Sequence, residues 1–187
     1  MTPTYQQGII LYGPPAAGKD TITEALSRLN PRCVQYPLLK LGPGRATSYR
    51  TATPDAIDAL RTAGDIIWEH RRYGALYVID RPTLAERLRL HVPVLHLGHP
   101  EAIPAVIDAD PTAHWLVVQL WCPREVAERR LGERITNDVA ERLRVWDSTP
   151  RIDTARSTIN TAETTAAEAA RLINSQLSPS PLSSSPP

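Results

Sequence analysis

The chain has 187 residues, a length that suits one domain of ordinary size and is too short for two well-cored ones. Its 21 basic and 20 acidic side chains give a formal net charge of +1, without the positive excess of a general nucleic-acid or membrane-surface binder. No apolar run approaches the roughly 18 residues that suggest a membrane span, and the polar start, MTPTYQQ, carries no basic leader. The sequence therefore predicts a cytoplasmic protein with no nucleic-acid and no membrane partner.

Cysteines and lysines are few. Cys33 and Cys122 stand far apart without a CxxC pair, which argues against a disulfide framework or a thiolate zinc site, so we expect two buried free thiols. Lys19 and Lys40 are the only lysines among the 21 basic residues. Because the chain otherwise uses arginine, we expect a lysine here to do what a planar guanidinium does not.

Hydrophobic patterning predicts strands that alternate with helices. The apolar run from Gly8 to Tyr12 predicts a strand, and the helical spacing of Ile22, Leu26 and Leu29 predicts a helix from Asp20 to Leu29. Further strands are predicted at 66–68, 75–79, 92–97, 114–121 and 157–159, and further helices at 54–64, 83–90, 125–131, 138–146 and 161–176. This order predicts an α/β sandwich with a mostly parallel sheet.

The sharpest motif is GPPAAGKDT, residues 13–21, between the first predicted strand and helix. It meets the G-x-x-x-x-G-K pattern of a phosphate-binding loop, in which glycines let successive backbone N–H groups point at phosphate oxygens and the helix N-terminus adds its positive end. The ammonium of Lys19 is expected between the β- and γ-phosphates of ATP. The residues expected to hold ATP are Gly13, Ala16, Ala17, Gly18, Lys19, Asp20 and Thr21.

The residue after the lysine departs from the usual pattern. A Ser or Thr normally follows and its hydroxyl binds Mg²⁺, whereas Asp20 stands here and Thr21 comes next. The metal ligand is therefore expected to be displaced to Thr21 or replaced by the carboxylate of Asp20. Asp80 is a rival, because LYVID at 76–80 has the four-apolar-then-Asp shape of a Walker B strand.

Beyond the loop, most of the chain resembles the guanylate kinase superfamily of P-loop kinases. SYRTATPDAIDALRTAGDIIWEHRRYGALY, residues 48–77, is similar to that family's acceptor-binding subdomain, and ERRLGERITNDVAERL, residues 128–143, is similar to its lid and following helix. The resemblance implies a P-loop NTPase fold: a three-layer α/β/α sandwich with a mostly parallel sheet, a small acceptor-binding subdomain and an arginine lid. One kinase domain would span residues 1–177, with the subdomain at 36–80, the lid at 130–140 and a disordered Ser/Pro tail at 178–187.

The same resemblance implies roles on the acceptor side. Tyr49 and Tyr77 match tyrosines that hold the acceptor phosphate, and Glu69 matches a glutamate that reads the guanine edge. Lys40 and Arg45 are further cations available for the acceptor phosphate.

On the donor side, Arg130, Arg134 and Arg142 match the family's phosphate-clamping arginines, which with Lys19 form the expected catalytic set. Phosphoryl transfer depends on charge neutralisation and alignment, which closing arginines supply. The alternative for each arginine is a solvated helix face, since exposed charge is the default.

Departures from the family pattern bear on the acceptor. QYPLLKLGPGR, residues 35–45, replaces the Ser-x-Thr-Thr-Arg segment of guanylate kinases, and His96 and Gly98 replace their Asp-x-Asp. His96 lies at the mouth of a predicted strand, where ligands bind in open α/β sheets, and is a candidate substrate-binding residue. These departures and Gly-Lys-Asp resemble the ribose 1,5-bisphosphate phosphokinase branch, whereas Glu69 favours a nucleotide.

The sequence thus predicts a P-loop kinase that moves the γ-phosphoryl of ATP, with Mg²⁺, onto a nucleoside monophosphate or a related phosphorylated small molecule. One alternative is a sugar-phosphate kinase similar to ribose 1,5-bisphosphate phosphokinase. An alternative of another class is a non-catalytic guanylate kinase-like binding module, which the replaced carboxylates favour and the intact Gly13, Gly18 and Lys19 oppose. The expected partner is the phosphorylated acceptor, and the expected state is a monomer or homodimer.

Overall fold

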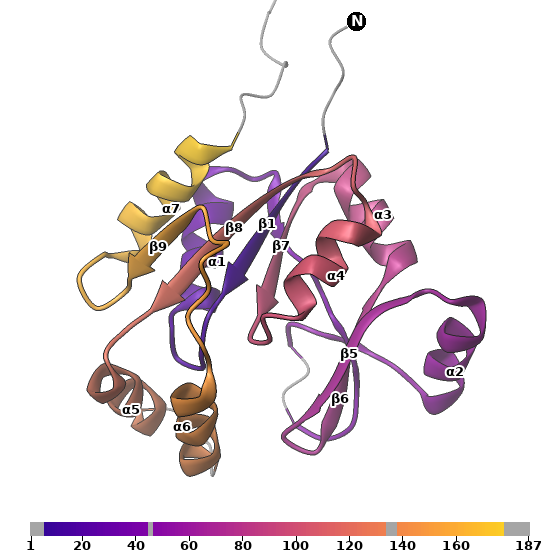
Figure 1. Cartoon of the computed structure of the whole chain (residues 1–187), viewed down its shortest axis with the longest axis horizontal. Coiled ribbons are helices and arrows are strands. Elements are labelled where there is room, and N and C mark those ends of the chain that lie inside the picture. Colours follow the sequence, from indigo (N-terminus) through magenta and orange to yellow (C-terminus); the bar gives the residue numbers. More distant parts are fainter. Residues whose placement is uncertain (1–5, 45–46, 134–137, 178–187) are drawn as a thin grey trace, which may run out of the picture.

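Five parallel strands form the main sheet within residues 6–44, 47–133 and 138–177, which the computed structural model describes. Their order is β2-β7-β1-β8-β9, and β1 lies between β7 and β8 at its centre (Figure 1). The strands are β1 Gln7–Tyr12, β2 Cys33–Gln35, β7 Val92–Leu97, β8 His114–Trp121 and β9 Ser157–Asn160.

Helices cover both faces of this sheet because alternate side chains of the buried strands point to opposite sides. Ile9 and Leu11 of β1 share a core cluster with α1 (Lys19–Leu29) and α7 (Ala166–Gln176). Ile10 and Tyr12 share another with α3 (Arg81–Leu90) and α4 (Ala102–Ala109). The three-layer α/β/α architecture with a parallel sheet is therefore confirmed.

A second, smaller sheet has the order β4-β3-β6-β5 and is mostly antiparallel. Its strands are β3 Leu39–Leu41, β4 Arg50–Thr51, β5 Ile66–Arg72 and β6 Ala75–Asp80, and α2 (Pro54–Ala63) packs on it through Ile57. Tyr73 and Gly74 form the tight β5–β6 turn. Both have a positive φ, 53° and 72°, as the turns favoured by two-residue hairpins require.

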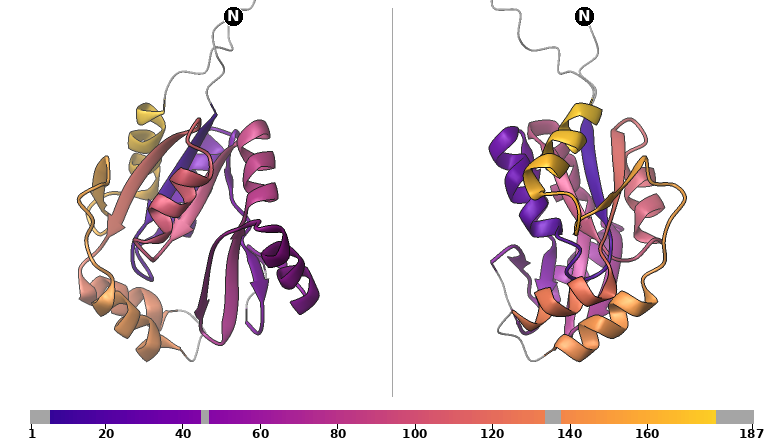
Figure 2. Two further views of the ribbon diagram at one scale, coloured as in Figure 1. Left: turned by 45° about the vertical axis from the view of Figure 1, so that its right-hand side comes forward. Right: turned by 90° about the vertical axis from the view of Figure 1, so that its left-hand side faces the viewer.

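The helices α5 (Arg124–Gly132) and α6 (Val139–Ser148) pack together through Ala127, Leu131 and Leu143. They and the second sheet extend on opposite sides beyond the carboxyl ends of the main strands (Figures 1 and 2). This arrangement places the loop after β1 between them.

Most predicted elements are present, with several differences. The predicted helix at 161–176 begins instead at Ala166, because the Thr165 hydroxyl and the Glu168 carboxylate form a capping box there. Trp68, Trp115 and Trp146 are partly buried and pack against core clusters, and Tyr12 and Tyr36 are the largest fully buried side chains. Elements absent from the prediction are β2, β3, β4 and α4.

Three further expectations from the sequence concern the cysteines, membrane-spanning segments and the residues outside the described ranges. Cys33 and Cys122 are buried free thiols, as predicted. None of the helices in the described part of the chain is long and apolar enough to cross a membrane. Arg45, Arg134 and the tail 178–187 lie outside the described residues.

Candidate phosphate-binding and acceptor site

The loop between β1 and α1 has the backbone that its glycines predict. A Cβ on Gly13 would lie 2.2 Å from the backbone oxygen of Leu120, so only glycine fits against β8. Gly18 has a φ of 88°, a left-handed conformation that leads directly into α1. Lys19 Nζ donates to the carbonyl oxygens of Gly13 at 2.5 Å and Pro14 at 2.8 Å, so the ammonium lies inside the curve of the loop.

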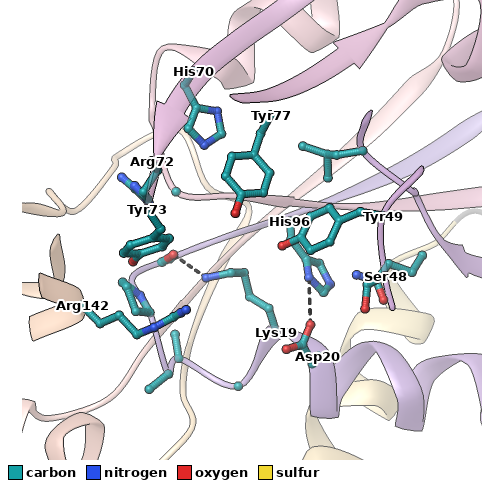
Figure 3. Close-up of a pocket in the computed structure, with 18 residues that line it drawn as sticks. Lys19, Asp20, Ser48, Tyr49, His70, Arg72, Tyr73, Tyr77, His96 and Arg142 are labelled. Carbon is teal, nitrogen blue, oxygen red and sulfur yellow. Dashed lines mark hydrogen bonds and ion pairs between the residues drawn. The ribbon is translucent and has the colours of Figure 1, made fainter. Parts of the chain in front are cut away.

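A cavity of about 210 Å³ opens beside this loop. The loop and the start of α1 form one wall, and the second sheet forms the other (Figure 3). Of the residues predicted from sequence, those that line the cavity are Gly13, Ala16, Ala17, Gly18, Lys19, Asp20, Tyr49, Tyr77, His96 and Arg142.

Aromatic rings form the wall opposite Lys19. The Tyr49 and Tyr77 centroids are 5.3 Å apart, and His70 stacks on Tyr77 at 5.3 Å with an interplanar angle of 17° (Figure 3). Lys40 is not among the lining residues: its side chain is buried next to the two tyrosines, with Nζ 5.5 and 5.8 Å from their centroids. Burial lowers the pKa of Lys40 and raises that of Tyr77.

Two arginines reach the cavity from different elements. Arg142 of α6 pairs with Asp138 at 2.8 Å and lies over the ring of Tyr73, 4.5 Å from its centroid. The hydrogen bond to Asp138 raises the pKa of Arg142. Arg72 of β5 lies against Gly98, where a Cβ would be 3.1 Å from its Nη1 atom. The cavity lining thus holds Lys19, Arg72 and Arg142 as cations, with Asp20 as the single carboxylate residue among the described lining residues.

His96 connects β7 to the start of α1. Its Nε2 atom is 2.7 Å from the hydroxyl of Thr23, and its Nδ1 atom is 3.4 Å from Oδ1 of Asp20 (Figure 3). Burial lowers the pKa of His96, although the hydrogen bond with Asp20 and its charge act in the opposite direction. The ring is therefore held neutral between two partners of the same helix.

Arg130 and Glu69 differ in position from the sequence expectation. Arg130 donates to the carbonyl oxygens of Ala16 and Thr161, which ties it to the β1–α1 loop, and it does not line the cavity. Glu69 accepts from Arg61 of α2 at 2.8 Å, since alternation along β5 turns it away from the cavity that His70 lines.

Two candidate metal ligands also lie outside the lining. Thr21 is exposed, because one residue along α1 turns its side chain away from the face that Asp20 occupies. Asp80 is 2% exposed, caps α3 at Thr83 N and forms an ion pair with Arg50, so its carboxylate is engaged within the second sheet and α3. Of the proposed carboxylates, Asp20 alone lines the cavity.

Several residues that line the cavity are not predicted from the sequence. His70 and Arg72 belong to β5, whose predicted extent stopped at Trp68. Had the strand been extended, its period of two would have put Trp68, His70 and Arg72 on one face and Glu69 on the other. The remaining missed lining residues are Pro15, Gln35, Leu38, Ser48, Tyr73 and Gly98.

Solved structures share this fold. The crystal structure of guanylate kinase from Anaplasma phagocytophilum matches with a TM-score of 0.64 and 15% identity, over 93% of this chain and 86% of that one. The chain has a guanylate kinase-like fold. The crystal structure of APE1195 matches with a TM-score of 0.55 and 14% identity, over 93% of this chain and 99% of that one. No family model and no curated protein matches the sequence, so the guanylate kinase-like fold rests on the structural likeness alone.

Proposed function

We propose that this chain is an ATP-dependent phosphotransferase that moves the γ-phosphoryl of ATP onto a phosphorylated small molecule, a nucleoside monophosphate or a related compound. The observation that carries the proposal is the position of Lys19, inside the loop and across one cavity from Tyr49 and Tyr77. A donor held by the loop and an acceptor held by the tyrosines would meet in that cavity. Such alignment, with neutralisation of charge, is most of what phosphoryl transfer requires.

Unpaired polar atoms of three residues that line the cavity support an anionic ligand. Among the described residues, the hydroxyl of Tyr73, Nδ1 of His70 and Nε of Arg142 are buried without a hydrogen-bond partner. Buried polar groups are seldom left unpaired, because an unmade hydrogen bond costs about 1–3 kcal/mol. A phosphate group would supply acceptors for the Tyr73 hydroxyl and the Arg142 Nε, and Arg72 and Arg142 would neutralise the phosphate charge.

The residues at the loop also fit Mg²⁺. This ion binds through one or two carboxylates, keeps several waters and takes the remaining ligands from substrate phosphates. Asp20 offers a half-exposed carboxylate at the loop and would hold the ion. When bound, Mg²⁺ would neutralise charge on the donor phosphates, while Lys19 and the loop amides orient them.

The position of Arg72 favours a second candidate, a sugar-phosphate kinase. The resemblance puts a base-reading Asp at position 98, whereas Gly98 here leaves room for the guanidinium of Arg72. Glu69, the other candidate base reader, points away from the cavity. A cation in place of a carboxylate suits a second anionic group on the acceptor better than the N–H edge of guanine.

ATP-to-ADP conversion tests the proposal. The reaction contains Mg²⁺ and, one at a time, GMP, dGMP, AMP, CMP, UMP or ribose 1,5-bisphosphate, with a control that lacks an acceptor. Turnover that needs an acceptor is expected, and Lys19→Ala should lower it about 100- to 1000-fold, the usual loss for one charge-stabilising donor. Stimulation by ribose 1,5-bisphosphate alone would select the second candidate.

Two variants serve as controls. Lys19→Arg keeps the charge but replaces a compact ammonium with a planar group, so it should stay well below wild-type turnover. Arg89→Ala changes an exposed residue of α3 and should keep wild-type turnover. ATP binding without any acceptor-dependent turnover, unchanged by Lys19→Ala, would instead favour a binding module.

A further inference from the structure

Asp20 and His96, two residues that depart from the usual P-loop pattern, contact each other in this protein. Asp20 stands where a hydroxyl residue normally follows the lysine, and His96 stands where the resemblance puts the metal-assisting Asp of the core strand. His96 is paired in register with Leu11 near the end of β1, so it lies at the strand edge from which the phosphate loop begins. Nδ1 of His96 and Oδ1 of Asp20 are 3.4 Å apart (Figure 3).

The hydrogen-bonding chemistry fixes the orientation of the imidazole. A carboxylate only accepts, so Nδ1 carries the proton that faces Asp20. Nε2 is then held by the hydroxyl of Thr23 at 2.7 Å. Asp20 and Thr23 are three residues apart and lie on one face of α1, so a single ring spans both. The His96 side chain is 11% exposed, whereas that of Asp20 is 55% exposed and lines the cavity.

We propose that His96 is a positioning residue that holds the carboxylate of Asp20 at the phosphate loop, so that the metal-binding carboxylate of this site comes from α1 instead of β7. This inference rests on the proposed function, because the metal accompanies the donor nucleotide. The hydroxyl and the strand carboxylate of the usual pattern are both missing, and one Asp–His pair takes their place. Partners that orient metal ligands typically change metal affinity 10- to 100-fold when removed.

The test measures metal binding rather than turnover. Mn²⁺ binding in the presence of ADP is followed by electron paramagnetic resonance, and ADP binding in EDTA is followed by calorimetry. His96→Ala should weaken Mn²⁺ binding about 10-fold or more, while ADP affinity in EDTA stays within about twofold of wild type because the loop amides and Lys19 are untouched. His91→Ala, at the end of α3, is the matched control and should change neither.

Two conservative variants separate positioning from packing. The amide nitrogen of Asn lies near the place of Nδ1, whereas that of Gln lies near the place of Nε2. His96→Asn should therefore keep most of the Mn²⁺ affinity by donating to Asp20, and His96→Gln should bind Mn²⁺ as weakly as His96→Ala. In an Asp20→Asn background, His96→Ala should cause no further loss, because His96 acts through Asp20.

The outcomes distinguish the inference from the proposed function. Unchanged Mn²⁺ affinity in His96→Ala, an equal further loss in the Asp20→Asn background, or retention by Gln rather than Asn would overturn the positioning role and leave the kinase proposal standing. If the wild-type chain binds neither ADP nor Mn²⁺–ADP, the proposed function and the inference both fail.

Discussion

Arg130 joins Thr161 to the phosphate loop. Its guanidinium donates to the backbone oxygen of Thr161 at 2.7 Å, to the Thr161 hydroxyl at 3.0 Å and to the backbone oxygen of Ala16 at 3.0 Å. The segment after β9 and the loop after β1 are thereby fixed to α5. Arg130 is not among the described residues that line the cavity, so these contacts act on the loop itself.

Arg130→Ala should consequently weaken ATP binding through the loop. Loss of hydrogen bonds from a charged donor costs about 1.5–3 kcal/mol, so we expect KM for ATP to rise about 10-fold or more and the melting temperature to fall. Arg130→Lys, which cannot make the same set of bonds, should lie in between. A fall in kcat with unchanged KM and unchanged melting temperature would show that Arg130 acts on the transferring phosphoryl group instead.

Arg72 and Glu69 make a second, paired prediction. They lie on opposite faces of β5, with Arg72 lining the cavity and Glu69 bound to Arg61. Arg72→Ala should raise KM for the acceptor about 10- to 100-fold, as expected for a lost charged hydrogen bond, with KM for ATP unchanged. Glu69→Gln should leave both constants within about twofold, since exposed ion pairs contribute little. Steady-state kinetics with each substrate varied measures both constants. A larger rise of KM for the acceptor in Glu69→Gln than in Arg72→Ala would instead identify Glu69 as the base reader.

The part of the candidate site at the β1–α1 loop is largely predictable from the sequence, because it follows a local motif. Gly13, Gly18 and Lys19 are set by one loop, and strand–loop–helix patterning around them is strong. The part of the candidate site on the second sheet depends on strand register and on contacts between distant segments. His70 and Arg72 reach the cavity only because β5 extends to Arg72, and Arg130 is hydrogen-bonded to Thr161, 31 residues away, instead of lining the cavity. No periodicity in the sequence reports such a partner.

His70 predicts a pH dependence of stability. Burial, followed by the charges of His99 and Arg72, lowers the pKa of His70 from 6.5 to about 4. Between these two pH values the unfolded chain binds a proton that the folded chain does not. The free energy of unfolding therefore falls as the pH falls from 6.5 toward 4.

His70→Phe keeps a ring against Tyr77 and removes the titration. Between pH 7 and pH 5, wild type should lose about 1–2 kcal/mol more stability than the variant, as measured by urea unfolding. His96 and His99 also have lowered pKa values and remain in both proteins, so the difference reports the titration of His70 together with its coupling to His99. If the free energy of unfolding depends on pH in the same way in the two proteins, the His70 ring is protonated equally in the folded and the unfolded chain.

Asp80 has two possible roles, one in stability and one in metal binding, and a single substitution distinguishes them. Its carboxylate accepts from Thr83 N at 3.0 Å, forms the ion pair with Arg50 and lies 3.3 Å from the hydroxyl of Tyr36. Asp80→Ala removes a helix cap and leaves Arg50 without this partner, so urea unfolding should show a loss of about 3 kcal/mol. Asp58→Ala, which breaks an exposed ion pair on α2, should cost well under about 1 kcal/mol.

Mn²⁺ affinity in the ADP complex should change little in the folded Asp80→Ala protein, because the carboxylate that lines the cavity is Asp20. Wild-type stability combined with lost Mn²⁺ binding would instead identify Asp80 as the metal carboxylate, as the LYVID pattern suggested.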